Sequence, residues 1–190
     1  MPDLPVRSHF NTGGAAEIRV EVDPRCFEPD PEAVEYYQKE KIESLTPEAV
    51  AKMKQRASAF VGERLRFFFD PVGEVKPEFV WEFDKLGDGK IPFETDDKNL
   101  LKGGETVLIG SWKTTIVSGM TGYRIDALPV APGQTRLNVM FLNSIGGRQV
   151  ERYAVLFPGE SSFTLDLTEQ GIFAKAGSRT EGSVGVEAQS

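Results

Sequence analysis

The chain has little of what most catalytic and metal sites are built from: 190 residues include one cysteine, Cys26, and one histidine, His9. A single cysteine cannot form an intramolecular disulfide or a cysteine-based metal cluster, and it does not reveal the compartment. A serine or cysteine hydrolase of the usual type holds a histidine between its nucleophile and an orienting acid. We expect His9 to be solvent-exposed in the leading segment, and Cys26 to be a partly buried structural side chain.

Clusters of basic residues and long apolar segments are also missing. The net charge is −7, and the sequence contains no run of lysine or arginine residues. Because an acidic surface repels the phosphate groups of nucleic acids, we expect no nucleic-acid partner. No segment approaches the roughly 18 apolar residues of a membrane span, so we expect no transmembrane segment. Residues 1–10 lack the apolar region of a signal peptide, which fits a cytoplasmic protein or the mature form of an exported one.

What the chain does have is strand-like alternation. Apolar Ala16, Ile18, Val20 and Val22 alternate with charged residues, and later segments repeat the pattern. A period of two predicts strands with one buried face and one wet face. Beyond the first strand at about 15–23, the pattern predicts strands at 64–70, 78–83, 106–117, 122–128, 135–143, 149–157 and 162–168.

Other segments predict the rest of the organisation. Residues 1–14 are mostly polar and end in a glycine pair, so they are interpreted as a flexible arm. Two helices are expected at 32–43 and 46–61, the second with Thr46 as N-cap, Pro47 at its first position and Gly62 as its stop. The domain then spans 15–171 with a helical insertion at 32–62, and 172–190 has the composition of a disordered tail or linker.

Turn signals join the predicted strands into hairpins at 118–121, 145–148 and 158–161. Short strands at regular spacing predict a mainly β fold, an antiparallel β-sandwich with a two-helix insertion after the first strand. In architecture alone this resembles immunoglobulin-like and fibronectin-like modules.

The acidic segment at residues 84–97 is a candidate calcium site. Residues 84–95 resemble the calcium loop of the EF-hand family, with Asp84 and Asp88 at ligand positions and Gly89 at the sharp turn. Leu86 and Thr95 stand where that loop has ligands, and the preceding residues alternate like a strand. The alternatives are a non-helical calcium site formed by Asp84, Asp88, Asp96 and Asp97, or an acidic solvated loop.

Weaker candidates come from other carboxylates and from aromatic residues. A second acidic group, Asp23, Glu28, Asp30 and Glu32, is suited to calcium or simply to turn formation. Glu82 and Glu151 are the carboxylates considered for a hydrolase. The run Phe67-Phe68-Phe69 requires cover on both sides of its strand, by a second sheet and by the helix pair, unless it forms an exposed aromatic platform. The tryptophans Trp81 and Trp112 and the tyrosines Tyr123 and Tyr153 are expected in the core.

The sequence therefore favours a non-catalytic binding or accessory domain over an enzyme, with a protein or small-molecule partner. We expect it to belong to an exported or envelope protein, periplasmic or extracellular, with a cytoplasmic location as the alternative. Two other functions stay open: a calcium-dependent ligand-binding module that uses residues 84–97, and a carboxylate-based hydrolase.

Overall fold

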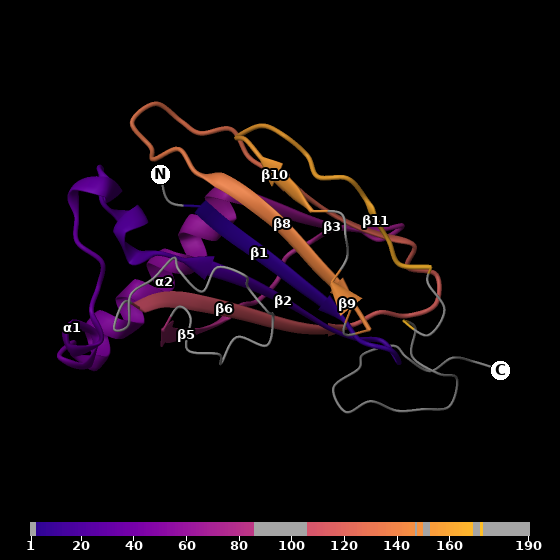
Figure 1. The fold of residues 1–190 in the computed structure, drawn as a ribbon, viewed down its shortest axis with the longest axis horizontal. Helices are drawn as coiled ribbons and strands as arrows, with labels where there is room; N and C mark the ends of the chain where they lie inside the picture. The colour runs from indigo at the N-terminus through magenta and orange to yellow at the C-terminus, as the bar shows by residue number, and fades with distance from the viewer. Residues whose placement is uncertain (1–2, 86–105, 147, 150–152, 169–171, 173–190) are drawn as a thin grey trace.

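A computed structural model describes residues 3–85, 106–146, 148–149, 153–168 and 172 (Figure 1). Two β-sheets dominate it, so the expectation of a mainly β protein is confirmed. The larger sheet has the order β10-β8-β1-β2-β6-β5, with the short β9 also paired to β8. Its strands are β1 (Asp3–Phe10), β2 (Ala15–Val22), β5 (Val80–Lys85), β6 (Thr106–Thr115), β8 (Asn138–Ile145), β9 (Arg148–Gln149) and β10 (Ala154–Leu156).

The smaller sheet has the order β11-β7-β3-β4. Its strands are β3 (Leu65–Asp70), β4 (Gly73–Val75), β7 (Gly122–Ala127) and β11 (Leu165–Asp166). Side chains from the two sheets meet in one core around Tyr123 of β7. Its ring centroid lies 5.6 Å from that of Phe10, 5.0 Å from that of Phe69 and 5.4 Å from that of Phe141. The sheets therefore share one apolar layer.

The expectation of a flexible arm at residues 1–14 is wrong. Residues 3–10 form β1, which lies between β2 and β8 in the larger sheet. Leu4, Val6, Ser8 and Phe10 alternate into the core and are almost fully buried. Pro5 lies within this inner strand although proline has no N–H to donate. The ladder with β2 starts at Val6, one residue later, so the antiparallel pairing does not need that donor.

The expectation that all strands pair in an antiparallel manner is also wrong, because β1 and β8 run parallel over eight residue pairs. Two of the three expected hairpins connect different sheets instead. The turn at 118–121 leads from β6 to β7, and the turn at 158–161 leads from β10 to β11. Only 145–148 joins paired strands, with Ile145 opposite Arg148. Turn residues show that the chain reverses, but sheet membership depends on which apolar faces meet.

The helical segment between β2 and β3 is only partly as expected. It contains the 3₁₀ helices η1 (Pro24–Phe27) and η2 (Pro31–Ala33) and the α-helices α1 (Lys39–Glu43) and α2 (Pro47–Arg64). The α2 start is confirmed, since the Thr46 side chain accepts a hydrogen bond from the Ala49 amide at 3.2 Å. The expected helix at 32–43 is wrong over residues 34–38, and Gly62 does not end α2, which runs on to Arg64 and directly into β3.

Candidate functional site

The proposed calcium loop is not assembled by the described residues. Asp84 belongs to β5 and pairs through its backbone with Val107 of β6. Asp88, Asp96 and Asp97 lie outside the described residues, as does the rest of the loop. Across the residues that the structure describes, no group of three histidine, cysteine, aspartate or glutamate residues is arranged to hold a metal ion. The calcium site therefore stays a prediction.

Two members of the second acidic group, Asp23 and Asp30, stabilise turns. The Asp23 carboxylate accepts a hydrogen bond from the Arg25 amide at 2.9 Å and forms an ion pair with the Arg25 guanidinium at 2.7 Å. The Asp30 carboxylate accepts from the Glu32 amide at 3.2 Å. Each aspartate thus caps a 3₁₀ helix that begins with proline, which is the turn-forming role expected of Asp-Pro pairs.

Two of the three residues considered for catalysis, His9 and Glu82, lie in the described part of the chain. His9 is not in an arm but on β1, where its ring nitrogens meet the Ser144 hydroxyl and, at 2.6 Å, the Asn11 side-chain oxygen. Glu82 is exposed on β5, and Glu151 lies outside the described residues. The pairing of these two carboxylates therefore stays untested.

The aromatic residues are mostly core, as expected, with Trp81 and Tyr123 buried and Trp112 packed against the core. Phe67 and Phe69 point inward, whereas the half-buried Phe68 lies on the outer face of the smaller sheet. The helix pair does not supply its expected cover: the Arg124 guanidinium stacks over the Phe68 ring at 3.9 Å.

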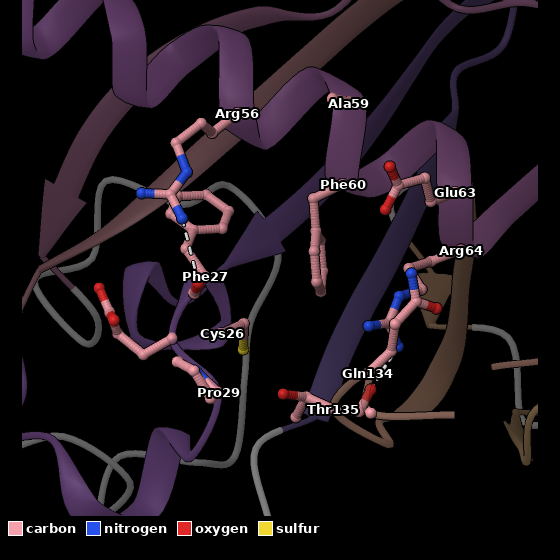
Figure 2. Close-up of a pocket in the computed structure, with 12 residues that line it drawn as sticks. Cys26, Phe27, Pro29, Arg56, Ala59, Phe60, Glu63, Arg64, Gln134 and Thr135 are labelled. Atoms are coloured by element: carbon pink, nitrogen blue, oxygen red, sulfur yellow. Dashed lines mark hydrogen bonds between the residues drawn. The ribbon is translucent and has the colours of Figure 1, made fainter. Parts of the chain in front are cut away.

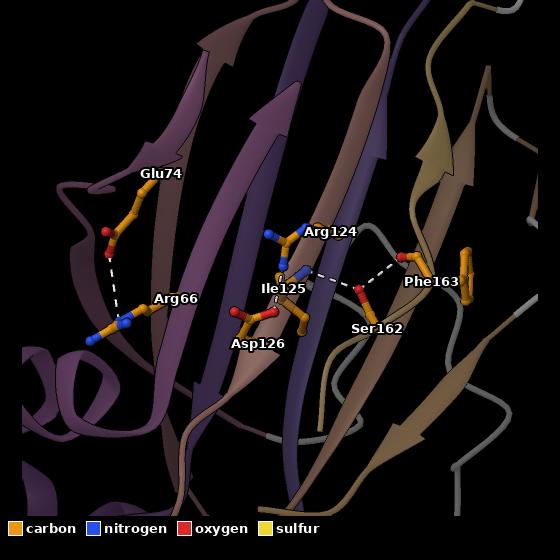
Figure 3. Close-up of polar contacts among 7 residues, drawn as sticks. All are labelled: Arg66, Glu74, Arg124, Ile125, Asp126, Ser162 and Phe163. Carbon is orange, nitrogen blue, oxygen red and sulfur yellow. Dashed lines mark hydrogen bonds and ion pairs between the residues drawn. The ribbon is translucent and has the colours of Figure 1, made fainter. Parts of the chain in front are cut away.

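Charged pairs occupy the same outer face, as Figure 3 shows. Arg124 bonds Asp126 at 2.5 Å, and Arg66 lies 3.8 Å from Glu74. On the edge of this sheet the Ser162 hydroxyl accepts from the Ile125 amide and donates to the Phe163 carbonyl. A surface of paired charges is typical of a solvated face, and it does not present a free aromatic platform.

Tyr153 departs from the expectation and marks the first candidate surface. It is 66% exposed, and Val155 and Phe157 are 44% and 54% exposed. These three residues, here called the edge row, alternate along β10 and its flanks, and β10 is the last strand of the larger sheet. Val155 pairs with the half-buried Met140 of β8, so the row continues onto the outer face of the sheet. Every residue from 153 to 157 is apolar, so the sequence could not show which of the alternating side chains face the solvent.

The second candidate surface is an open groove of about 380 Å³ between η1, the C-terminal half of α2 and the loop at 133–135 (Figure 2). Two arginines of α2 flank it, and each guanidinium lies 4.8 Å from a phenylalanine ring: Arg56 over Phe27 and Arg64 over Phe60. The rings of Phe27 and Phe60 meet edge to face at 5.9 Å. No sequence motif pointed to this groove, because its three segments are far apart in the chain.

Cys26 also lines the groove, but its thiol is held in the unreactive, protonated form. Burial, and to a smaller extent the negative charge of Asp23, raises the pKa of the Cys26 thiol to about 12. A thiol is a nucleophile only as a thiolate. The expectation that Cys26 is at least partly buried is confirmed, and the groove is better suited to binding than to covalent chemistry.

No helix among the described residues is long and apolar enough to cross a membrane. Compared with known proteins, the chain matches no family model, no curated protein and no solved structure.

Proposed function

We propose that the protein is a non-catalytic binding domain that takes an extended segment of a protein partner at the β10 edge of its larger sheet. The observation that carries the proposal is the edge row, Tyr153, Val155 and Phe157, on β10. Edge strands expose unpaired N–H and C=O groups, and soluble proteins usually protect them with charges, proline or bulges. An apolar edge row lacks this protection and is therefore suited to pair with a strand of another protein.

The chemistry of the edge favours a strand over a helix as the bound element. A strand added to a sheet edge forms main-chain hydrogen bonds, and its alternate side chains contact the alternate side chains of the edge strand. The three exposed residues follow that period of two, whereas a bound helix needs a groove with contacts every three to four residues. We therefore expect a partner segment with apolar residues at alternate positions.

The exposed Val80 provides a matched control, since it lies on β5 at the opposite edge of the same sheet and is 67% exposed. A displayed library of random heptapeptides is selected on the wild-type protein and counter-selected on Val155→Lys. We expect enriched peptides with alternating apolar residues, whose binding is lost in Val155→Lys and kept in Val80→Lys. Amide chemical-shift changes should centre on residues 153–157.

Two results would overturn the proposal. One is a selection that yields no peptide dependent on Val155. The other is a wild-type dimer that Val155→Lys converts to a monomer, because the edge would then be occupied by a second copy. The immunoglobulin-like classification of the sheets and an exported or envelope location remain part of the proposal; their support is the β-rich, two-sheet architecture alone.

A further inference from the structure

The groove between η1 and α2 contains a buried cation, Arg64, that has no matching anion among the residues that the structure describes. Arg64 is 6% exposed, and its Nη1 donates to the Thr135 carbonyl at 2.5 Å. Its Nε is buried and has no hydrogen-bond partner in the described part of the chain. Burial lowers the pKa of Arg64, which reflects a charged group in a poorly solvated place. Buried charges in proteins are normally paired, so this one indicates a missing partner.

A carboxylate would supply what the Arg64 side chain lacks. Guanidinium groups bind carboxylates through two parallel N–H···O bonds, and Nε takes part in one of the two common arrangements. Among the described residues, Arg64 forms no ion pair, although Glu63 immediately precedes it on the same helix and lines the same groove. Burial lowers the pKa of Arg64 by more than the nearby charges of Cys26 and Glu63 raise it.

The rest of the groove defines the body of the ligand. The contacting rings of Phe27 and Phe60 offer an apolar surface between the two arginines. Arg56, the second cation, is held over this surface because its Nη2 donates to the Phe27 carbonyl at 3.0 Å. A ligand between the arginines would therefore meet apolar carbon below and positive charge at its sides (Figure 2).

The acidic residues of the groove limit the ligand's charge. Glu28 and Glu63 line it together with Arg56 and Arg64, so the four formal charges cancel. A dianion such as phosphate would meet both carboxylates, whereas a single carboxylate can lie on the arginine side. We infer that the groove binds a small organic monocarboxylate with an apolar body, held by Arg64 and Arg56 over Phe27 and Phe60. This inference is independent of the edge row, with which it shares no residue.

Benzoate tests the inference, with benzyl alcohol as the neutral probe of similar shape and inorganic phosphate as the dianionic probe. Binding is followed by nuclear magnetic resonance of the intact protein, using the arginine Nε–H signals and the backbone amides. We expect a benzoate Kd on the order of 1 mM, as befits a ligand of so few atoms. The Arg64 Nε–H signal should shift on saturation, and the alcohol and phosphate should bind at least about tenfold more weakly.

Two variants and one control separate binding from folding. Arg64→Lys keeps the positive charge but loses the two parallel N–H donors of the guanidinium group. We therefore expect at least about a tenfold rise in the benzoate Kd. Because Arg64 is buried and could be needed for folding, Arg56→Gln gives a second test at an exposed position, with an expected rise of about threefold to tenfold. Arg66→Gln, on the outer face of the smaller sheet, should leave the Kd unchanged.

Three outcomes would overturn the inference. Equal binding of benzyl alcohol would show an apolar cleft without charge recognition. Equal binding by Arg56→Gln, by a folded Arg64→Lys and by the wild type would place the benzoate elsewhere. An unshifted Arg64 Nε–H signal at about 20 mM benzoate, well above the expected Kd, would show that the groove does not take carboxylates.

Discussion

The indole of Trp81 on β5 lies directly over Gly110 of β6, its partner in the ladder. A Cβ atom at position 110 would come within 2.8 Å of the Trp81 ring. The ring cannot easily move aside, because it is buried and its Nε1 donates to the Ser58 hydroxyl of α2 at 2.7 Å. The contact thus ties the larger sheet to α2 through the absence of a side chain at Gly110.

Gly110→Ala should therefore destabilise the protein by about 1–3 kcal/mol, the usual cost of overpacking a core. Urea denaturation followed by Trp fluorescence measures it. Gly62→Ala is the matched control: Gly62 lies within α2, with open space where its Cβ would stand. That variant should gain up to about 1 kcal/mol from helix propensity. Equal effects from the two substitutions would show that Trp81 does not lie against Gly110.

Arg7 and Glu21 form a buried ion pair between β1 and β2, at 2.9 Å, with side chains only 9% and 5% exposed. Arg7→Met should cost about 3–5 kcal/mol, because Glu21 would remain buried without its partner. The double variant Arg7→Met/Glu21→Leu should be more stable than the sum of the single losses predicts, as measured by a double-mutant cycle in urea. Lys39→Met, in the exposed pair with Glu43, should change stability by about 0.5 kcal/mol or less. Additive losses at Arg7 and Glu21 would contradict a coupled pair.

The Cys26 thiol should be inert in the folded protein and reactive once the protein unfolds. Because its pKa rises from an ordinary value of 9.0 to about 12, the folded state keeps the proton while the unfolded state releases it. Its contribution to stability is complete below about pH 9 and is lost as the pH rises through 12. Relative to Cys26→Ala, the wild type should lose on the order of 1 kcal/mol per pH unit in that interval. Urea titrations of both proteins under reducing conditions, at pH 8 to about 10.5, measure the difference. Rapid labelling of the native thiol at pH 8 would refute the buried, protonated state.

Thr46 should be worth about 1 kcal/mol as the N-cap of α2, the loss expected for Thr46→Ala. The hydroxyl oxygen accepts from the Ala49 amide, so removing it leaves one of the first amides of the helix dependent on water. Thr46→Ser keeps the acceptor and should retain most of the stability in the same urea assay. An equal loss in both variants would mean that the methyl group, not the cap, matters.

Local patterns were enough to predict most strands and the start of α2. Alternation at 15–23 and 64–70 closely matches β2 and β3, and Thr46-Pro47 matches the N-terminus of α2. Both signals act between near neighbours in the chain, where side-chain period and capping chemistry operate. Gly62 does not end the helix because the cost of glycine within a helix, about 1 kcal/mol, is smaller than the gain from burying its apolar neighbours Phe60 and Val61.

Neither candidate surface could be found in the same way. The groove brings together Phe27, Arg64 and Thr135, which come from three separate parts of the chain. The residues of the edge row are uniformly apolar, so finding it required knowing that, among the described strands, β10 pairs with β8 alone.

The sequence by itself determined that this is a mainly β protein with a capped helix near its start, because period and capping depend on residues a few positions apart. Only the tertiary structure decided that residues 3–10 form an inner strand, parallel to β8, whose paired residues lie 135 positions later in the chain. It also decided that β10 ends the larger sheet and that Arg64 is buried without an anion among the described residues. These features depend on which apolar faces meet across long separations in the chain, and only the packed core settles that choice.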